Sequence, residues 1–130
     1  MAFTGERVFS KETVRQVRRM LTMVVRTGSG RRAAVPGYSV AGKTGTVHKA
    51  TAGGYAEDRY VSLFAGLAPA DEPQVAAVVT IDEPQRGEHF GGRVAAPIFG
   101  SVMSDTLRLL NVPPDEFDAD VGMLAVAEQL

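Results

Sequence analysis

Apolar residues recur at helical spacing in the first part of the chain, directly after Ser10. The recurring positions are Val14, Val17, Leu21, Val24 and Val25. Spacings of three and four residues predict an amphipathic helix with Ser10 as its N-cap and an end near Arg26. Four basic residues of this stretch are expected on its exposed side, namely Lys11, Arg15, Arg18 and Arg19.

A second helical pattern follows near the other end of the chain. Pro97 suits the first turn of a helix, because no intrahelical bond needs its missing N–H there, and Pro113-Pro114 stop the helix. The apolar spacing predicts a buried face made of Ile98, Val102, Met103, Thr106, Leu109 and Leu110.

Between the two helical patterns lie three stretches rich in β-branched, aromatic and small residues, at 38–47, 60–67 and 75–81. Such residues favour strands. The connections are short, with a glycine pair in the first and two prolines in the second, which favours an antiparallel meander. The sequence therefore predicts an α+β fold, a three-stranded antiparallel meander packed by helices, with Phe64 in its core.

Composition narrows the function classes. The chain has 130 residues, 45% of them hydrophobic, which suits one small domain or part of a larger one. Because it has no cysteine, disulfide scaffolds, thiol nucleophiles and cysteine metal sites are excluded.

His48 and His89 lack metal-ligand spacing and are expected at the surface, and Asp82-Glu83 read as a strand end before a turn. We therefore expect no metal and no cofactor.

Charge is unevenly distributed along the chain. Residues 1–50 hold ten Lys and Arg and two Asp and Glu, whereas residues 51–130 hold four and thirteen. A basic half can indicate an anionic partner. No aromatic residues interleave the arginines as a single-strand binder would need, so no nucleic acid is expected and solvated faces are favoured.

The segment from Gly37 to Thr44 matches the phosphate-binding P-loop pattern letter for letter. A P-loop needs a strand before its first glycine and a helix starting at its lysine. Here Pro36 and a polar stretch come first, and Thr44–Val47 are poor helix formers. A nucleotide hydrolase is therefore the less favoured alternative.

Lys43-Thr44-Gly45-Thr46 on a strand is also one of the signatures of penicillin-binding proteins and serine β-lactamases. A strand edge lets a peptide substrate pair as an extra strand. Gly45 leaves room for a substrate backbone or a catalytic serine. Thr44 and Thr46 point to the same side, so two hydroxyls and the Lys43 ammonium are expected to face one groove and hold a carboxylate.

The sequence around this signature resembles class B penicillin-binding proteins, in particular the division-specific members of the penicillin-binding protein 3 type. The resemblance covers about residues 8–115, and its ordered segments are 35–46, 59–69, 81–84, 90–99 and 111–114. It implies that residues 1–115 are the C-terminal part of a transpeptidase (penicillin-binding) domain with the serine β-lactamase-like fold. Residues 116–130 are then an acidic C-terminal tail.

The family makes peptidoglycan crosslinks at the division septum. Its serine attacks the D-Ala-D-Ala end of a stem peptide, and β-lactams mimic that end. Carried over, the resemblance implies that Lys43 belongs to the active-site hydrogen-bond network and that Thr44 and Thr46 bind the substrate or β-lactam carboxylate. The Thr46 amide would form half of the oxyanion hole, and Tyr60 and Phe90 would form an aromatic wall beside the ligand.

Two family motifs, Ser-x-x-Lys and Ser-x-Asn, are absent from the chain. Each of its six serines lacks a lysine three residues later, and Leu109 lies two before the only asparagine, Asn111. Both motifs lie upstream in the family, so we expect a fragment that carries no nucleophile and is inactive alone. The alternative is a truncated, non-catalytic binding module of the same fold.

The resemblance also implies a place and partners for the parent protein. It would sit at the bacterial inner membrane, on the periplasmic side, with division proteins as partners. The longest wholly apolar stretch here, Val75–Val79, is far short of a membrane span. If the helices normally cover a larger sheet, the isolated fragment exposes apolar surface, and self-association is expected.

Overall fold

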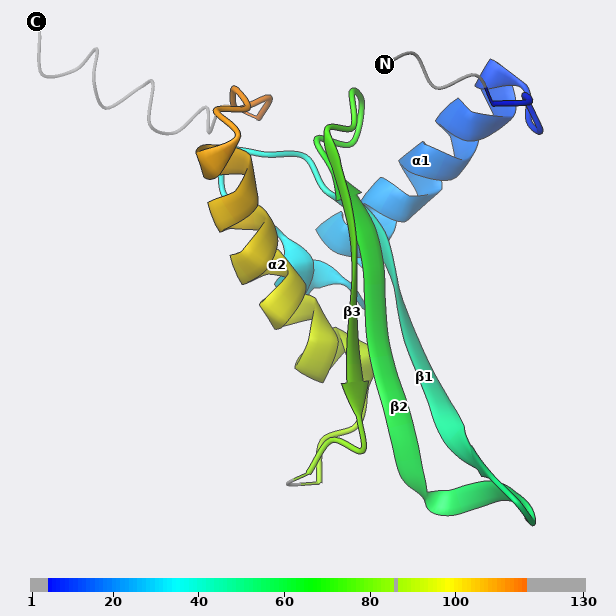
Figure 1. Cartoon of the computed structure of the whole chain (residues 1–130). Helices are drawn as coiled ribbons and strands as arrows, with labels where there is room; N and C mark the ends of the chain where they lie inside the picture. The colour runs from blue at the N-terminus through cyan, green and yellow to red at the C-terminus, as the bar shows by residue number, and fades with distance from the viewer. Residues whose placement is uncertain (1–4, 86, 117–130) are drawn as a thin grey trace, which may run out of the picture.

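A computed structural model describes residues 5–85 and 87–116 of the chain (Figure 1). The elements are α1 (Lys11–Arg26), the short 3-10 helix η1 (Arg31–Ala33), β1 (Ala41–Thr51), β2 (Gly54–Ala68), β3 (Val75–Asp82) and α2 (Gly91–Leu109). The order of helix, three strands and helix confirms the predicted α+β class. Of the expected acidic tail, only Glu116 falls within the described residues.

The three strands form one sheet in the order β1-β2-β3, with both neighbouring pairs antiparallel, so the predicted meander is confirmed. β1 starts at Ala41, later than predicted, because Pro36-Gly37 turn the chain and Val35 bridges to Tyr38. The first hairpin is longer than predicted, since pairing continues to Thr51 opposite Gly54. Its tip therefore extends past the end of β3 (Figure 1).

Helix α1 begins where the N-cap signal placed it. The Ser10 hydroxyl accepts a hydrogen bond from the Thr13 N–H at 3.0 Å, which satisfies one of the unpaired donors of the first turn. The predicted apolar face is only partly covered. Val25 is buried, whereas Val14 and Val17 keep 40% and 43% of their surface exposed. Arg18, expected to be exposed, is half-buried and donates to the Asp71 carbonyl.

The predicted buried face of helix α2 was only partly right, because Met103 is buried as predicted but most of the other predicted residues are not. The helix starts at Gly91, so Pro97 lies inside it and not in its first turn. Ile98 and Leu109, predicted to be buried, are 42% and 81% exposed. The residues that are buried are Gly91, Ala95, Ala96, Phe99, Gly100, Met103 and Leu107.

Small residues explain which face of α2 turns inward. Alanine and glycine around Phe99 let the helix backbone approach the sheet closely, and the Phe99 ring packs on Phe64 with centroids 4.7 Å apart. Phe64 is fully buried, as predicted. Of the predicted face, Met103 is buried, whereas Ile98, Val102 and Leu109 remain exposed.

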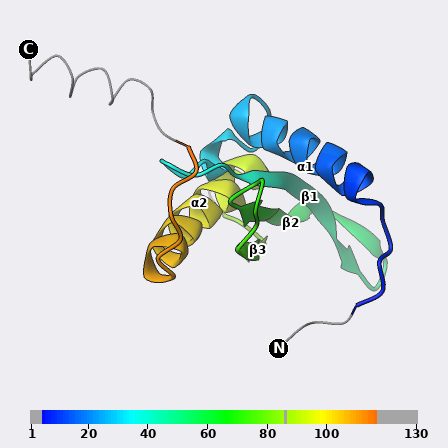
Figure 2. The ribbon, with the colours of Figure 1, turned by 90° about the horizontal axis from the view of Figure 1, so that it is seen from above.

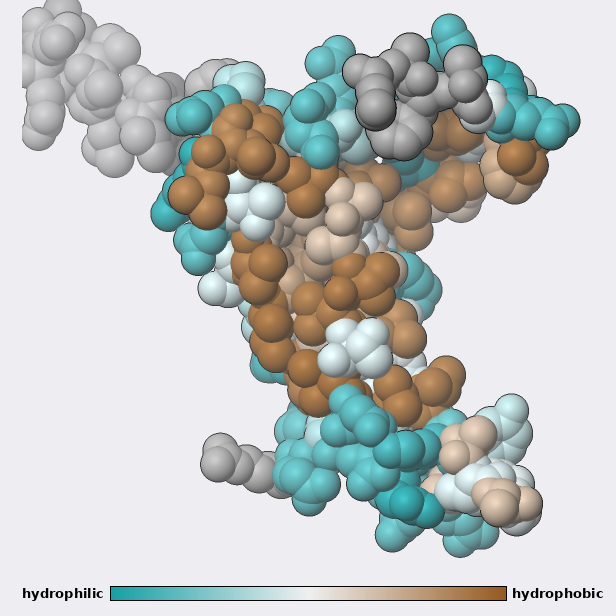
Figure 3. Space-filling view, in the orientation of Figure 1, coloured by the Kyte–Doolittle hydropathy of each residue, from teal (hydrophilic) through white to brown (hydrophobic). Residues whose placement is uncertain are grey.

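The two helices lie on opposite sides of the sheet (Figures 1 and 2). The main core is on the α2 side, where the largest fully buried side chains are Phe64, Phe99, Met103 and Leu107. Apolar surface remains open over α2, the sheet and α1 (Figure 3). Among the described helices, none is long and apolar enough to cross a membrane.

Candidate functional site

Residues 43–46 lie in β1, an edge strand of the described sheet. The backbone is extended on both sides of Lys43, and the next helix along the chain starts only at Gly91. A phosphate-binding loop requires a helix to begin at its lysine. The nucleotide-hydrolase alternative is therefore incompatible with the local structure.

The Lys43 ammonium and the Thr44 hydroxyl meet although the two side chains start on opposite faces of the strand. The long lysine stem lets Nζ donate to the Thr44 carbonyl at 3.0 Å, and Nζ also lies 3.4 Å from Thr44 Oγ1. On its other side, Thr44 Oγ1 is 3.0 Å from Ser29 Oγ. Ser29, which sequence reasoning missed, thus joins the polar cluster from the turn after α1.

The Thr46 hydroxyl is held from the other direction. The N–H of Gly91, the first residue of α2, donates to Thr46 Oγ1 at 3.0 Å. An N–H can only donate, so the hydroxyl oxygen accepts there and its own proton stays available for a further acceptor. Thr46 is therefore oriented by helix α2, and its hydroxyl can donate its proton to a carboxylate.

A groove of about 420 Å³ connects these elements. It lies between the turn after α1, strand β1 and the start of α2, and is lined by Gly28, Ser29, Arg31, Arg32, Thr44, Thr46, Phe90, Gly91, Gly92 and Arg93. Three arginines give it a basic wall, which suits an anionic ligand. Of the predicted site, Thr44, Thr46 and Phe90 line the groove, and Lys43 contacts Thr44 from outside it.

A larger hollow of about 490 Å³ lies at the other end of α2, between the β2–β3 turn and residues 110–115. It is lined by none of the predicted site residues, so size alone does not identify the site.

Gly45 has a close neighbour within the protein itself. A Cβ at this position would lie 2.8 Å from the Leu63 side chain. A Cβ on Gly91 would lie 2.4 Å from the carbonyl oxygens of both Gly45 and Leu63. Bare backbone at Gly91 therefore lets α2 begin directly against the β1–β2 ladder, whereas bare backbone at Gly45 leaves room for the Leu63 side chain, a packing reason in addition to the predicted approach of a substrate.

Tyr60 and Phe90 are connected through His89. The Tyr60 ring stacks on His89 with centroids 4.1 Å apart and an interplanar angle of 13°, and the His89 and Phe90 centroids are 4.4 Å apart. His48 packs on Tyr60 at 4.6 Å. His48 is exposed as expected, whereas His89 is half-buried. The Ser62 hydroxyl, buried in β2, donates to the His89 carbonyl.

The sequence analysis did not predict that His89 stacks on Tyr60 or that Ser62 bonds to the His89 carbonyl. The available signal was an imidazole directly before Phe90-Gly91, since a planar ring beside another aromatic residue can extend a stack. The described residues contain no group of three His, Asp or Glu side chains that could hold a metal ion.

Comparison with known proteins identifies relatives of this arrangement. Residues 3–104 match the protein family described as "Penicillin binding protein transpeptidase domain". The chain is 50% identical over 105 residues to the probable peptidoglycan D,D-transpeptidase PbpC of Pseudomonas aeruginosa, covering 80% of this chain and 19% of that protein. It is 45% identical over 112 residues to the peptidoglycan D,D-transpeptidase FtsI of Escherichia coli K12, covering 85% of this chain and 19% of FtsI.

A solved structure also matches this chain as a transpeptidase domain. The transpeptidase domain of Burkholderia pseudomallei penicillin-binding protein 3, in its apo form, matches with a TM-score of 0.79 and 49% sequence identity. The match covers 88% of this chain and 35% of that one. The chain thus spans about a fifth of the length of the curated relatives and about a third of the solved domain.

Proposed function

The chain belongs to the penicillin-binding protein transpeptidase domain family, and from that premise we propose that it forms one wall of a peptidoglycan D,D-transpeptidase site. The observation that carries the proposal is the meeting of the Lys43 ammonium with the Thr44 hydroxyl on an extended edge strand, beside a basic groove. The complete protein would crosslink stem peptides and bind β-lactams. This chain alone supplies no nucleophile and is inactive.

The complete protein would carry out acyl transfer through a serine ester. A serine oxygen attacks the carbonyl of the penultimate D-Ala, the C–N bond to the terminal D-Ala breaks, and D-alanine leaves carrying a proton. An amine of a second stem peptide then attacks the acyl-serine, forms the new peptide bond and returns a proton to the serine. A β-lactam enters the first step and stays bound.

Each residue of the strand has a role in this proposal. Lys43 contributes positive charge to the active-site network. Thr44 and Thr46 donate to the ligand carboxylate, and the orientation of Thr46 by Gly91 supports this, because the hydroxyl oxygen accepts from Gly91 and its proton has no acceptor among the described residues. The Thr46 amide forms half of the oxyanion hole. Gly45 admits the substrate backbone.

Tyr60 and Phe90 form the aromatic wall, with His89 between them. We place the parent protein at the periplasmic face of the inner membrane, with division proteins as its partners. We also propose that the isolated chain associates with itself through its open apolar surface (Figure 3).

Labelled penicillin tests this function. The purified chain is expected to form no covalent adduct. A chimera is expected to form one when this chain replaces the matching segment of the Burkholderia pseudomallei domain, because the host supplies the serine. Lys43→Met in the chimera is expected to abolish most of the labelling, while Lys11→Met on α1 leaves it unchanged. Labelling of the chain alone, or no labelling of a folded chimera, contradicts the proposal.

A further inference from the structure

Strands β1 and β2 lose their regular pairing at one place. His48 pairs with Tyr60, but the next pair along β1 joins Ala50 to Tyr55. Lys49 therefore stands opposite four residues of β2, 56–59, so the extra residues of this bulge-like irregularity lie on β2. A bulge redirects a side chain and bends the strand that contains it. Beyond this point the hairpin continues without β3 beside it (Figure 1).

Lys49, on β1 opposite this irregular part of β2, extends its side chain across the sheet. Its Nζ donates to Asp82 Oδ2 at 2.8 Å and to Glu83 Oε1 at 2.7 Å. Both carboxylates raise the pKa of Lys49 above its ordinary value, with the hydrogen bond to Asp82 as the largest cause. Since β2 lies between β1 and β3, this cross-sheet bridge joins the two edge strands over the middle one.

The same bridge holds Tyr60. Glu83 has a positive φ of 47°, a backbone conformation uncommon for a residue with a side chain. In that conformation its N–H donates to the Tyr60 carbonyl at 2.9 Å while its carboxylate faces Lys49. Glu83 therefore bonds to Tyr60 through its backbone N–H and to Lys49 through its side-chain carboxylate.

We infer that Lys49, Asp82 and Glu83 position Tyr60, and through its stack on His89 also Phe90, at the edge of the groove. Lys49 is thus a positioning residue for the aromatic wall. Without the bridge, β1 loses its side-chain contact with the end of β3, and Tyr60 moves away from His89, although His48 still contacts the Ala56 carbonyl and Arg59 still lies 3.7 Å from the Glu83 carboxylate. The consequence for ligand binding rests on the proposed function, whereas the position of the rings does not.

The two histidines of the chain provide a direct readout, because both rings pack on Tyr60. Imidazole NMR signals are recorded for the wild-type chain and for Tyr60→Leu, which removes the ring and defines the unstacked reference. Lys49→Met is expected to move the His89 signals most of the way to that reference. Lys49→Arg is expected to keep them near the wild-type values, because a guanidinium can donate to both carboxylates.

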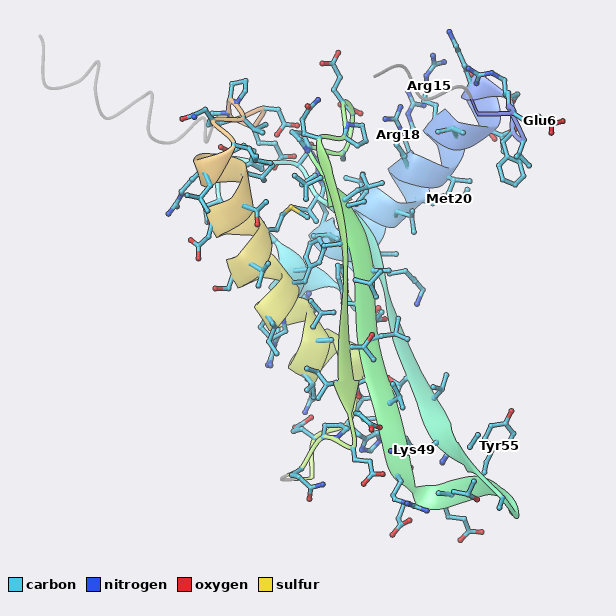
Figure 4. All side chains as sticks on the ribbon, in the orientation of Figure 1. Glu6, Arg15, Arg18, Met20, Lys49 and Tyr55 are labelled. Carbon is cyan, nitrogen blue, oxygen red and sulfur yellow. The ribbon has the colours of Figure 1, made fainter. Side chains whose placement is uncertain are left out.

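The matched control is Arg15→Met, which removes a 2.9 Å ion pair with Glu12 on α1, at the other end of the molecule (Figure 4). It is expected to leave the imidazole signals unchanged. If Lys49→Met does not fold, Glu83→Gln replaces it, since glutamine keeps the size and the backbone N–H but loses the charge. His89 signals that stay at wild-type values in a folded Lys49→Met or Glu83→Gln chain overturn the inference.

Binding of an acyl-D-Ala-D-Ala peptide is measured in a second experiment, by following the imidazole NMR signals as the peptide is added. Wild-type chain is expected to bind it, with a several-fold loss of affinity in Lys49→Met and none in Arg15→Met. A wild-type chain that does not bind the peptide counts against the proposed groove, while the unliganded imidazole spectra still decide the role of Lys49.

Discussion

At the scale of single residues, Gly91 sits where a side chain has no room. A Cβ would lie 2.4 Å from two carbonyl oxygens of the β1–β2 ladder, and the amide of this residue binds Thr46. One backbone position therefore connects helix packing with the orientation of a proposed ligand-binding hydroxyl. The constraint comes from backbone atoms, which cannot move aside as a flexible side chain can.

Gly91→Ala is accordingly expected to lower the free energy of unfolding by about 1–3 kcal/mol, the usual range for overpacking. Gly53→Ala is the control, because a Cβ at that position meets nothing within 4 Å. Urea denaturation of both variants measures the effect. Equal stabilities for the two variants would show that α2 can shift outward at little cost.

At the scale of elements, the segment after α2 returns to the turn that leads into β1. The Asp115 carboxylate accepts from the Ser39 N–H at 2.8 Å and from the Ser39 hydroxyl. Ser39 is buried, and its Oγ also accepts from the Ala70 N–H at 2.8 Å. The Tyr38 hydroxyl donates to the Val112 carbonyl at 2.7 Å. These contacts tie α2, the β2–β3 turn and the start of β1 together.

Asp115→Ala is expected to cost about 1–3 kcal/mol of unfolding free energy, because a buried N–H and a hydroxyl lose a charged acceptor. Glu72→Ala, at an exposed acidic position in the β2–β3 turn, is the comparison and is expected to change stability by less than about 0.5 kcal/mol. Thermal unfolding followed by circular dichroism distinguishes the two. A loss of the same size in both variants would argue that net charge, and not this contact, is responsible.

At the scale of the whole molecule, apolar side chains remain open on both helices and on the sheet (Figure 3). Met20 and Met23 on α1 are 61% and 51% exposed, Val78 on β3 is 67% exposed, and Val102 on α2 is 50% exposed. Contiguous open apolar surface of this kind favours association. The relatives extend far beyond this segment, which fits surfaces that other parts of a domain would cover.

The isolated chain is therefore expected to form oligomers whose size grows with concentration. Met20→Glu combined with Val78→Glu is expected to shift it toward monomer, since both charges would lie in the apolar surface. Tyr55→Glu, at the tip of the first hairpin (Figure 4), tests whether any added negative charge has this effect. Light scattering over a concentration series measures it, and a wild-type chain that stays monomeric throughout contradicts the expectation.

The order of the elements could be predicted from local signals in the sequence. Ser10 capped the first helix, the β-branched stretches became strands, and the short connections made the meander, because each depends on neighbours along the chain. The Lys43–Thr46 signature and its flanking segments likewise sufficed to indicate the family. In α2, hydrophobic spacing predicted the burial of Met103 correctly but failed for Ile98 and Leu109, because fit to the sheet decided which residues were buried.

The sequence by itself therefore determined the succession of elements and the chemical character of the edge strand, since both are set by residues within a few positions of one another. Tertiary structure alone decided which residues far apart in the chain contact one another. Gly91 donates to Thr46, His89 stacks on Tyr60, and Lys49 bonds to Glu83 across an intervening strand. Each of these contacts joins residues far apart in the chain, so each exists only once the meander has closed and α2 has packed on it.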